Sequence, residues 1–596
     1  MEAFGIEHLE TNIAIDPGPS IPDGYADLYY GTCGFRASVE TPQNHLDHVV
    51  YRCGILLALM PFLRGPNRPS SQAISEERPV HAHDDTSGVE DNLNRTVSAG
   101  VVITASHNGP EDNGIKILEN NGNLLDPFWE NKLTQFINWR DDIGKYLSNM
   151  LRSHAIEYIS TKQIYKIFIG CDTRDSGPHL CHMLDKGIKA AAEAFMLKGV
   201  ISINLGVVTT PTVSYILHNN LNGATDDTQY VEALKEAFIG AVYALQSLGC
   251  VTKHDGLTKM RPLCYDCAYG VGAYVIVRFF HCLELLGIDA SVCNNPETDP
   301  INAQKLLNDR CGAHYVVSAM KPPRSVELSE GQWCASFDGD ADRLVYFTPK
   351  DNSVLLIDGT RLLVLTVKFM KLLMDLSQPD ERQPISIGIL VNRYANGAAV
   401  QYIESMVAQW NSPSSRIIWE LQFCNVGVKH FQAKALDYDI AIFYESNGHG
   451  NVIFNKTHRY LGDADLMEKV SYIFRNPIGD AVANTLFVEL ALYTLGLTYN
   501  DVLGFYNDLP CVNDTVNVPQ HKLQYFRSCS ENDTILLEPR ELQDLVEEST
   551  SRYNGARAFI RPSGTEPKCR IYAEAPTMEE ALLLVDEIKT HIQRFL

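Results

Sequence analysis

Strands, polar turns and helices alternate along most of this chain, and this pattern limits the possible folds more than any other feature. Short apolar, β-branched runs followed by turn residues are found at 167–170, 201–208, 263–266 and 385–391. Helical periodicity predicts helices at 45–63, 128–151, 178–198, 273–287 and 477–498. Such alternation favours α/β layers with mixed sheets. The repetition is one of pattern only, without the repeated letters of a solenoid.

Three regions depart from this alternation. Residues 64–95 are rich in Pro, Ser, His, Asp and Asn, so we expect an exposed insertion. Residues 218–232 are rich in Asn, Asp and Thr and are expected to form a loop or a domain junction. Residues 473–596 end in a strand–loop–strand pattern around 561–572, which indicates a separate C-terminal α+β domain.

Composition restricts the classes of partner and the compartment. The formal charge of −23 argues against nucleic acid or an acidic membrane as the main partner. No run of 18 apolar residues is present, and the first residues lack the features of a secretory signal, so we expect no membrane span. The 15 cysteines form no framework, and a single Cys-x-x-Cys at 264–267 does not predict a zinc site. We therefore expect a reduced, cytoplasmic protein.

A serine lies in a loop directly after a predicted strand at 101–103. The loop reads Thr104-Ala-Ser-His-Asn108, and a second strand containing Lys116 follows it. A hydroxyl beside a histidine and a lysine suits chemistry on an anion. Taken alone, the segment is more typical of a tight loop whose Ser and Asn side chains cap their own backbone.

Three carboxylates alternate in the stretch Phe337-Asp-Gly-Asp-Ala-Asp-Arg343. Their mutual repulsion favours a cation that gathers them, and all-oxygen ligands select a hard ion such as Mg²⁺. An EF-hand would need Gly in place of Arg343 and Glu in place of Pro349, so calcium is disfavoured. Apolar residues on both sides argue against a merely solvated acidic turn.

Two later loops carry polar groups suited to a phosphosugar. Tyr444-Glu-Ser-Asn-Gly-His-Gly450 offers donors and acceptors for sugar hydroxyls, although an ordinary turn is an equal reading of it. The stretch from Arg561 to Arg570 combines two arginines, two hydroxyls and a glycine, which is typical of a phosphate cradle. The chain has neither a Walker motif nor Gly-x-Gly-x-x-Gly, so a usual nucleotide loop is excluded.

Together these four stretches resemble the loops of the α-D-phosphohexomutase superfamily, in the family's order and over nearly the whole chain. Further matches to the family lie at Tyr30–Arg36, Asp172–Arg174, Gly206–Pro211, Tyr394–Gly397 and Gly427–His430. The resemblance implies three similar α/β domains with mixed sheets and a C-terminal α+β phosphate-binding domain around a shared cleft. The phosphoserine, metal-binding, sugar-binding and phosphate-binding domains are expected at 1–218, 219–356, 357–472 and 473–596.

The resemblance also implies an activity. Asn447 and the Gly427–His430 stretch are similar to the members that act on N-acetylglucosamine phosphates. We therefore expect reversible interconversion of N-acetylglucosamine 6-phosphate and 1-phosphate, through a bound 1,6-bisphosphate and a phosphoserine at Ser106. This activity would supply UDP-N-acetylglucosamine synthesis. The expected cofactors are Mg²⁺ and a sugar 1,6-bisphosphate activator. The expected partner is a small phosphosugar, with neither nucleic acid nor membrane.

The same resemblance assigns roles to individual residues. The expected catalytic residues are Ser106, His107, Lys116, Arg36 and Arg343. The expected metal ligands are Ser106, Asp338, Asp340 and Asp342. The expected sugar-binding residues are Glu445, Asn447, His449 and Lys429, and the expected phosphate-binding residues are Arg561, Ser563, Gly564, Thr565 and Arg570. His449, Lys116 and His107 all remain candidates for the general base.

Other functions predict different behaviour. A phosphoglucomutase or phosphomannomutase would use the same chemistry on another sugar. A non-catalytic paralogue would be expected to lose Ser106 or a metal-loop aspartate, and both are present. A sugar kinase would need the missing nucleotide loop. Small departures from the family, such as the proline at position 110 rather than 109, leave the chemistry intact but bear on the choice of sugar.

Overall fold

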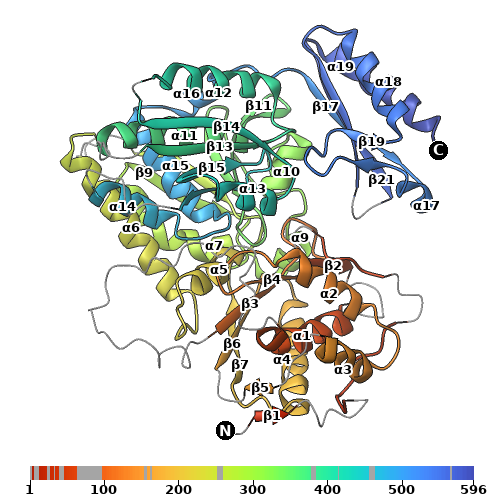
Figure 1. Cartoon of the computed structure of the whole chain (residues 1–596). Helices are drawn as coiled ribbons and strands as arrows, with labels where there is room; N and C mark the ends of the chain where they lie inside the picture. The colour runs from red at the N-terminus through yellow and green to blue at the C-terminus, as the bar shows by residue number, and fades with distance from the viewer. Residues whose placement is uncertain are drawn as a thin grey trace.

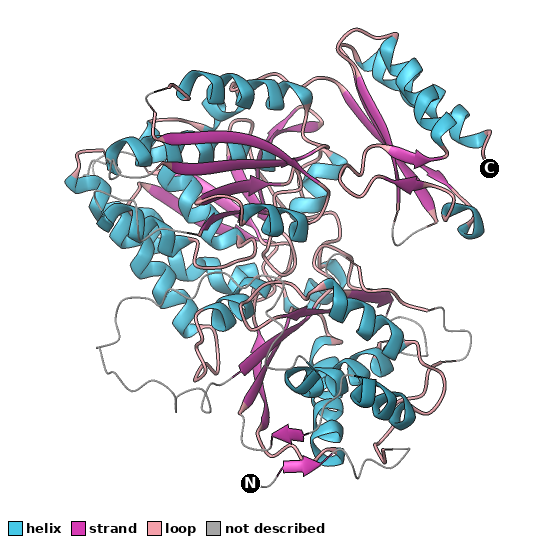
Figure 2. Cartoon of the chain, viewed as in Figure 1, coloured by secondary structure: helices cyan, strands magenta, loops and turns pink. Residues whose placement is uncertain are grey.

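We analysed a computed structural model of the chain (Figures 1 and 2). It describes residues 3–5, 13–22, 27–31, 34–38, 46–63, 97–153, 158–160, 164–250, 260–377, 384–413, 415–455, 464–563 and 567–596. The predicted insertion at 64–95 lies outside these residues. No helix in these ranges is both long enough and apolar enough to cross a bilayer.

The first sheet has five strands in the order β2-β4-β3-β6-β7, and it delivers the serine loop. They are β2 (Phe35–Ser38), β4 (Asp112–Leu118), β3 (Val97–Ile103), β6 (Tyr165–Cys171) and β7 (Val200–Val207). Strands β3, β6 and β7 are parallel, whereas β2, β4 and β3 pair antiparallel. The sheet is therefore mixed, as the sequence predicts.

Helices cover both faces of this sheet. Successive side chains of a strand point to opposite faces, and in β3 the side chains on both faces are apolar. Val101 and Ile103 pack in the same core as α1 (Asp47–Leu63), α2 (Pro127–Ile137), α3 (Ile143–Ser153) and α4 (Gly177–Ala194). Val102, which points the other way, packs with α5 (Thr210–His218). Strands buried on both faces explain the continuous apolar runs in the sequence.

The second and third sheets repeat the plan of a parallel block extended by antiparallel strands. The second has the order β12-β11-β10-β8-β9, with β8 (Arg261–Asp266), β9 (Ile288–Cys293), β10 (Trp333–Phe337), β11 (Leu344–Lys350) and β12 (Ser353–Ile357). The third has the order β14-β13-β15-β16, with β13 (Ile385–Asn392), β14 (Ile417–Cys424), β15 (Ile440–Tyr444) and β16 (Gly450–Phe454). In the second sheet the parallel strand β10 ends at the predicted metal loop, and in the third sheet the parallel strand β15 ends at the predicted sugar loop.

One large core joins these two sheets. It includes residues of α6 (Thr228–Ser247), α11 (Gly359–Ser377), α12 (Gly397–Trp410), α14 (Ala464–Ile473) and α15 (Ala481–Leu495). The remaining helical segments of this part are α7 (Gly272–Ile276), the 3₁₀ turn η3 (Val277–Phe279), α8 (Phe280–Glu284), α9 (Pro300–Leu306), α10 (Gly312–Ala319), α13 (Val428–Ala435) and α16 (Tyr499–Leu503). Two of the three mixed sheets are therefore held together by burial of apolar surface.

The C-terminal sheet is antiparallel and has its own core. Its order is β17-β21-β20, formed by β17 (Cys511–Asn517), β21 (Lys568–Glu574) and β20 (Arg557–Pro562). Helices α18 (Arg540–Ser551) and α19 (Met578–Gln593) pack on it, and Figure 1 shows this unit standing to one side of the other sheets. Short elements complete the chain: β1 (Ala3–Gly5), β5 (Tyr158–Ser160), α17 (Gln520–Leu523), β18 (Arg527–Ser528) and β19 (Leu536–Glu538).

The predicted fold class is confirmed. Three mixed sheets precede a C-terminal antiparallel sheet with helices, and each of these four sheets lies within one expected domain, except that β12 extends to Ile357. We keep the four domain limits as a proposal.

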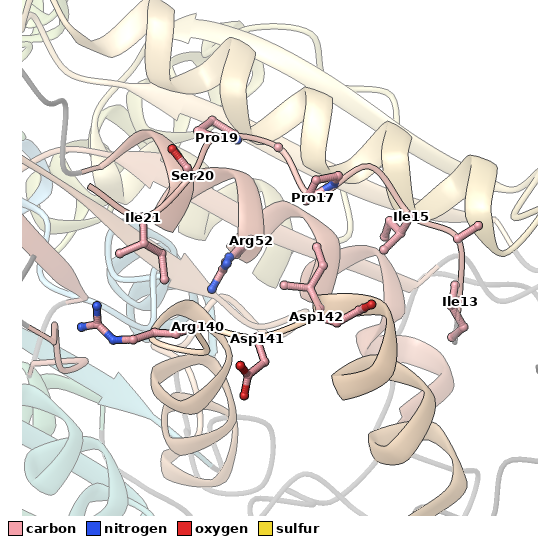
Figure 3. Close-up of a pocket in the computed structure, with 13 residues that line it drawn as sticks. Ile13, Ile15, Pro17, Pro19, Ser20, Ile21, Arg52, Arg140, Asp141 and Asp142 are labelled. Carbon is pink, nitrogen blue, oxygen red and sulfur yellow. The ribbon is translucent and has the colours of Figure 1, made fainter. Parts of the chain in front are cut away.

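The prediction of one helix at 128–151 was wrong. The segment 128–151 forms two helices because the first one ends at Ile137. Arg52 caps that end by donating through Nη1 to the carbonyls of Phe136, Ile137 and Trp139, at 3.1, 3.0 and 2.6 Å. Figure 3 shows Arg52 between the 13–21 segment and the 140–142 turn, in a cavity of about 680 Å³.

The segment 218–232 is not entirely a loop, because α6 begins at Thr228. The Asp226 carboxylate accepts a hydrogen bond from the Thr228 amide at 2.8 Å, which helps to start the helix. The polar segment 218–232 therefore contains the first residues of α6 as well as a linker.

Candidate active site

Strand β3 ends directly before the serine loop, which turns the Ser106 side chain toward the second sheet. Ser106 has φ 55°, a left-handed conformation that few non-glycine residues adopt. Its amide donates to Thr104 Oγ1 at 2.8 Å, and its Oγ donates to Asp338 Oδ2 at 2.8 Å. The side chain is nearly inaccessible, with 1% exposed. The serine hydroxyl and the predicted metal loop are therefore in direct contact.

Two side chains, the half-buried Asn308 and the buried Arg174, hold the backbone of the serine loop. Asn308 donates through Nδ2 to the carbonyls of Ser106 and Asn108, at 2.8 and 2.9 Å. Arg174 donates to the carbonyls of Asn108 and Asp112, at 2.6 and 2.7 Å. Arg174 belongs to a stretch that the family resemblance had marked. Asn308 was missed, because a single Asn in a turn gives no signal of a contact 200 residues away.

The metal loop places three carboxylates together between β10 and β11. Asp338 and Asp340 are fully buried and Asp342 is 5% exposed. One oxygen from each lies within 4.8 Å of the others. Asp338 Oδ1 accepts from the amides of Asp342 and Arg343, at 3.0 and 3.2 Å, and Ala341 takes a left-handed φ of 57° to close the turn. The alternating aspartates therefore converge as the sequence predicts.

Positive charge partly compensates this cluster. Lys116 on β4 bonds through Nζ to Asp340 Oδ2 at 2.6 Å and to Asp342 Oδ2 at 2.9 Å, and it is 2% exposed. Arg343 Nε lies 3.6 Å from Asp338 Oδ2. Thr210, at the start of α5, donates its hydroxyl to Asp340 Oδ2 at 2.6 Å. Thr210 lies in the Gly206–Pro211 stretch that matches the family, but it was not among the predicted site residues.

The three carboxyl groups have different proton affinities. Burial and the negative charges of Asp342 and Asp340 raise the pKa of Asp338 well above its usual range. Burial would also raise the pKa of Asp342, but Lys116, His449 and Arg343 together hold that pKa well below its usual range. A further cation beside Asp338 would lower its pKa and make the group a stronger ligand.

The cluster has unused acceptor atoms that fit a hard cation. Among the described residues, Oδ1 of Asp340 and Oδ1 of Asp342 are buried and accept no hydrogen bond. Buried carboxylate oxygens without donors are costly unless a cation binds them. Oxygen-only ligands that leave coordination positions for phosphate and water match Mg²⁺. The residues present therefore fit the predicted metal.

The sugar loop, residues 445–449, lies against the metal loop. The Leu344 amide donates to the Gly448 carbonyl at 3.0 Å, and His449 Nδ1 lies 3.6 Å from Asp342 Oδ1. Glu445 is 8% exposed and accepts from Asn392 Nδ2 at 3.3 Å. Through these contacts, loops from all three mixed sheets meet at one site.

Within this loop, the polar groups have different local roles. Asn447 Oδ1 accepts from the His449 amide at 2.9 Å and so shapes the turn. His449 Nε2 accepts from the Gly479 amide at 3.3 Å. A nitrogen that accepts a hydrogen bond carries no proton, so the His449 proton is on Nδ1, facing Asp342.

His107 and Arg36 lie beside the serine. The rings of His107 and His314 are 4.6 Å apart, and His107 Nδ1 is buried without a hydrogen-bond partner among the described residues. Burial, Arg343, Arg36 and His314 lower the pKa of His107, which favours the neutral ring. Arg36 donates through Nη1 to Asn108 Oδ1 at 3.2 Å.

Three of the five predicted phosphate-binding residues line a cavity of about 900 Å³. Arg561, Ser563 and Arg570 reach it from the C-terminal domain, together with Lys429 and His430 on α13 and several residues of the first domain. Arg561 Nε donates to Asp533 Oδ2 at 2.9 Å. Gly564 and Thr565 lie outside the described residues.

Lys429 lies in this cavity, where three domains meet. It forms an ion pair with Glu130 on α2, and its Nζ is 5.4 Å from the centre of the Tyr30 ring. The nearby Gln432 donates through Nε2 to Asn123 Oδ1 at 3.1 Å. The structure thus groups Lys429 with the phosphate-binding residues, whereas Glu445, Asn447 and His449 lie next to the metal loop.

Three mixed sheets, a separate antiparallel domain and a serine in contact with a carboxylate cluster define a phosphohexomutase. Family models agree with this class. Residues 89–143 match phosphoglucomutase/phosphomannomutase, alpha/beta/alpha domain I, and residues 536–591 match the C-terminal domain of the same family. Residues 358–497 match phosphoacetylglucosamine mutase AMG1, domain III.

Whole-chain comparisons narrow the class. The human phosphoacetylglucosamine mutase is 30% identical over 94% of this chain and 93% of its own length. The Arabidopsis thaliana enzyme of that name is 30% identical over 97% and 96%. The chain belongs to the phosphoacetylglucosamine mutase family.

Solved structures support this assignment. Aspergillus fumigatus N-acetylphosphoglucosamine mutase, in complex with N-acetylglucosamine 6-phosphate and magnesium, is 27% identical and covers 96% of this chain and 97% of its own, with a TM-score of 0.76. An N-acetylglucosamine-phosphate mutase in its product complex is 26% identical with the same coverages and a TM-score of 0.77. Another Aspergillus fumigatus structure contains glucose 1,6-bisphosphate, at 27% identity, coverages of 97% and 96%, and a TM-score of 0.75.

Proposed function

We propose that this chain interconverts N-acetylglucosamine 6-phosphate and N-acetylglucosamine 1-phosphate, with Ser106 as the phosphoryl carrier. The reaction is supported by the relatives of that name and by their complexes with substrate, product and a sugar bisphosphate. The observation that carries the role of Ser106 is its 2.8 Å hydrogen bond to Asp338 within the buried carboxylate cluster. Supply of UDP-N-acetylglucosamine synthesis stays a prediction.

The reaction consists of two phosphoryl transfers. In the first, the phosphoryl group leaves Ser106 Oγ for the O1 hydroxyl of the 6-phosphate, whose proton is removed, and the 1,6-bisphosphate forms. The intermediate then reverses its orientation. In the second transfer, Ser106 Oγ receives the 6-phosphoryl group, O6 takes up a proton and the 1-phosphate is released. The serine is phosphorylated again at the end, so the cycle is balanced.

Such transfers depend on positioning and on neutralisation of charge. Asp338, Asp340 and Asp342, with a phosphoserine oxygen, would hold Mg²⁺, which supplies a Lewis acid for the transferring group. Arg36 and Arg343 add positive charge beside the loop. Lys116 keeps two of the carboxylates in place and balances their charge.

The three candidate bases, His449, Lys116 and His107, differ in whether their nitrogen atoms already have hydrogen-bond partners. His449 carries its proton on Nδ1 toward Asp342, and its other ring nitrogen already accepts from Gly479. Lys116 already uses its Nζ to contact two carboxylates, those of Asp340 and Asp342. We propose His107 as the base because its ring is neutral and its Nδ1 has no hydrogen-bond partner among the described residues, although its lowered pKa makes it a weaker base than an ordinary histidine. His107→Gln should lower kcat by about 10²–10⁴-fold with little change in KM. A loss confined to KM would contradict this role.

The second cavity accounts for the binding of either orientation. Arg561, Ser563, Gly564, Thr565 and Arg570 would hold the phosphate that does not react, whichever carbon carries it. Lys429 adds a positive charge on the facing wall, where its pairing with Glu130 limits its movement. Glu445, Asn447 and His449 would bind sugar hydroxyls between the two sites.

A coupled assay with Mg²⁺ and catalytic sugar 1,6-bisphosphate tests this function. N-acetylglucosamine 6-phosphate should be turned over faster than glucose 6-phosphate, and Ser106→Ala should lose activity on both. Ser405→Ala, on the exposed side of α12, is the matched control and should be fully active. Faster turnover of glucose 6-phosphate would favour a phosphoglucomutase, and an active Ser106→Ala would refute the serine mechanism.

A further inference from the structure

Three cysteines lie side by side on the second sheet, away from the serine and the metal loop. Cys293, Cys264 and Cys334 come from the adjacent parallel strands β9, β8 and β10. Cys264 is in register with Cys334, and Cys293 is in register with Asp266, two residues beyond Cys264. Because side chains alternate along a strand, all three thiols share one face of the sheet.

The cluster does not depend on the Cys-x-x-Cys sequence at 264–267. Cys267 lies beyond the end of β8, and its thiol donates to the carbonyl of Tyr265 at 3.7 Å. The partners of Cys264 are instead 29 and 70 positions away in the chain, on the strands to either side of it. No local motif could therefore have revealed the group, since only the parallel strand register brings its members together.

The distances between the three sulfur atoms are close to the distances between sulfur ligands of a single metal ion. The three Sγ atoms lie within 4.8 Å of one another, and those of Cys264 and Cys293 are 3.3 Å apart. Four sulfur ligands at the usual zinc–sulfur bond length would be separated by about 3.8 Å. Rotamer adjustments of under an ångström would thus bring all three into ligand positions. All three are free thiols.

The cluster can be reached from one side of the sheet. Cys334 is buried, whereas Cys264 and Cys293 are partly exposed, and β9 is the edge strand of the sheet. Solvent therefore has access from one side, where a water molecule or Ser291 could complete a fourth ligand position.

We propose that Cys264, Cys293 and Cys334 form a binding site for a thiophilic divalent cation of the zinc type, distinct from the carboxylate site that fits Mg²⁺. Sulfur ligands select a softer ion than carboxylate oxygens do, so the two sites discriminate between the two cations. Binding replaces the thiol protons, which pass to solvent. The bound ion links β9, β8 and β10 and stabilises the second sheet.

Cobalt titration of the full-length protein tests this site. The chain is reduced, stripped of metals and kept in excess Mg²⁺, so that the carboxylate cluster is saturated. Co²⁺ then serves as a coloured substitute for Zn²⁺. We expect a near-ultraviolet sulfur-to-cobalt charge-transfer band that saturates at one ion per chain and disappears when Zn²⁺ is added. Zn²⁺ should also raise the Tm.

Matched variants separate this site from other thiols. Cys264→Ser and Cys293→Ser should each weaken cobalt binding by roughly tenfold or more. Cys511→Ser, which removes an exposed thiol on β17, should leave the band unchanged. Mutase activity in excess Mg²⁺ shows that each variant is folded. An equal band in Cys264→Ser and Cys511→Ser would overturn the proposal, as would reduced wild-type protein without any band.

Discussion

Replacing Lys116 by Met removes a buried ammonium group while keeping most of the side-chain volume. Lys116 is 2% exposed and contacts two aspartates at 2.6 and 2.9 Å. Without it, Asp342 keeps Arg343 and His449 within 4 Å, whereas among the described side chains Asp340 keeps the hydrogen bond from the Thr210 hydroxyl and no cation. Removal of one member of a buried ion pair costs about 3–5 kcal/mol. We expect that loss of unfolding free energy, and a Tm lower by roughly 6–20 °C for an unfolding unit of about 150–250 residues.

Magnesium should restore much of this loss, because a cation among the aspartates replaces the missing ammonium. A ligand at 100 times its Kd stabilises by about 2.7 kcal/mol. Thermal unfolding with and without Mg²⁺ should therefore show a larger increase in Tm for Lys116→Met than for wild type. Lys189→Met is the control, since its pair with Asp185 is exposed and worth about 0.3–0.5 kcal/mol. Equal Mg²⁺ responses, or a loss below about 1 kcal/mol, would refute the charge argument.

Two further predictions concern the third domain. A Cβ at Gly359 would lie 1.8 Å from a backbone oxygen of the sugar loop, so Gly359→Ala should raise KM several-fold in steady-state kinetics. Gly223→Ala, where nothing lies within 4 Å, should match wild type, and an unchanged KM for both variants would contradict the proposed role of that loop. Burial raises the pKa of Asp358 from 3.8 to about 6, so the folded state binds this proton more tightly than the unfolded state. The stability of wild type should therefore fall, relative to Asp358→Asn, by up to roughly 3 kcal/mol between pH 4 and pH 7 in urea unfolding, and parallel pH profiles would show that this carboxyl is not responsible.

The sequence predicted best those helices and strands whose formation depends on residues close to one another in the chain. Alternation of apolar strands and helices was sufficient to predict the mixed α/β layers, because strands covered on both faces must be continuously apolar. The helix end at Ile137 is capped by Arg52, whose side chain comes from another helix. The helical periodicity of 128–151 contains no trace of that contact.

Some residues of the candidate site could likewise be predicted from local sequence, and others could not. The aspartates at 338, 340 and 342 could be predicted as a group because their spacing itself creates the repulsion that a cation relieves. Asn308 and Thr210 act on residues more than a hundred positions away, so their roles depend on tertiary packing. The pairing of Lys429 with Glu130 likewise depends on how two domains meet.

Ser106 and Asp338, whose side chains touch, are 232 positions apart, and Arg561 follows later still. During synthesis on the ribosome, the serine loop therefore emerges long before the carboxylates that complete its surroundings, and the C-terminal sheet emerges last. The contact between the serine hydroxyl and the metal loop can therefore form only after more than half of the chain has been synthesised.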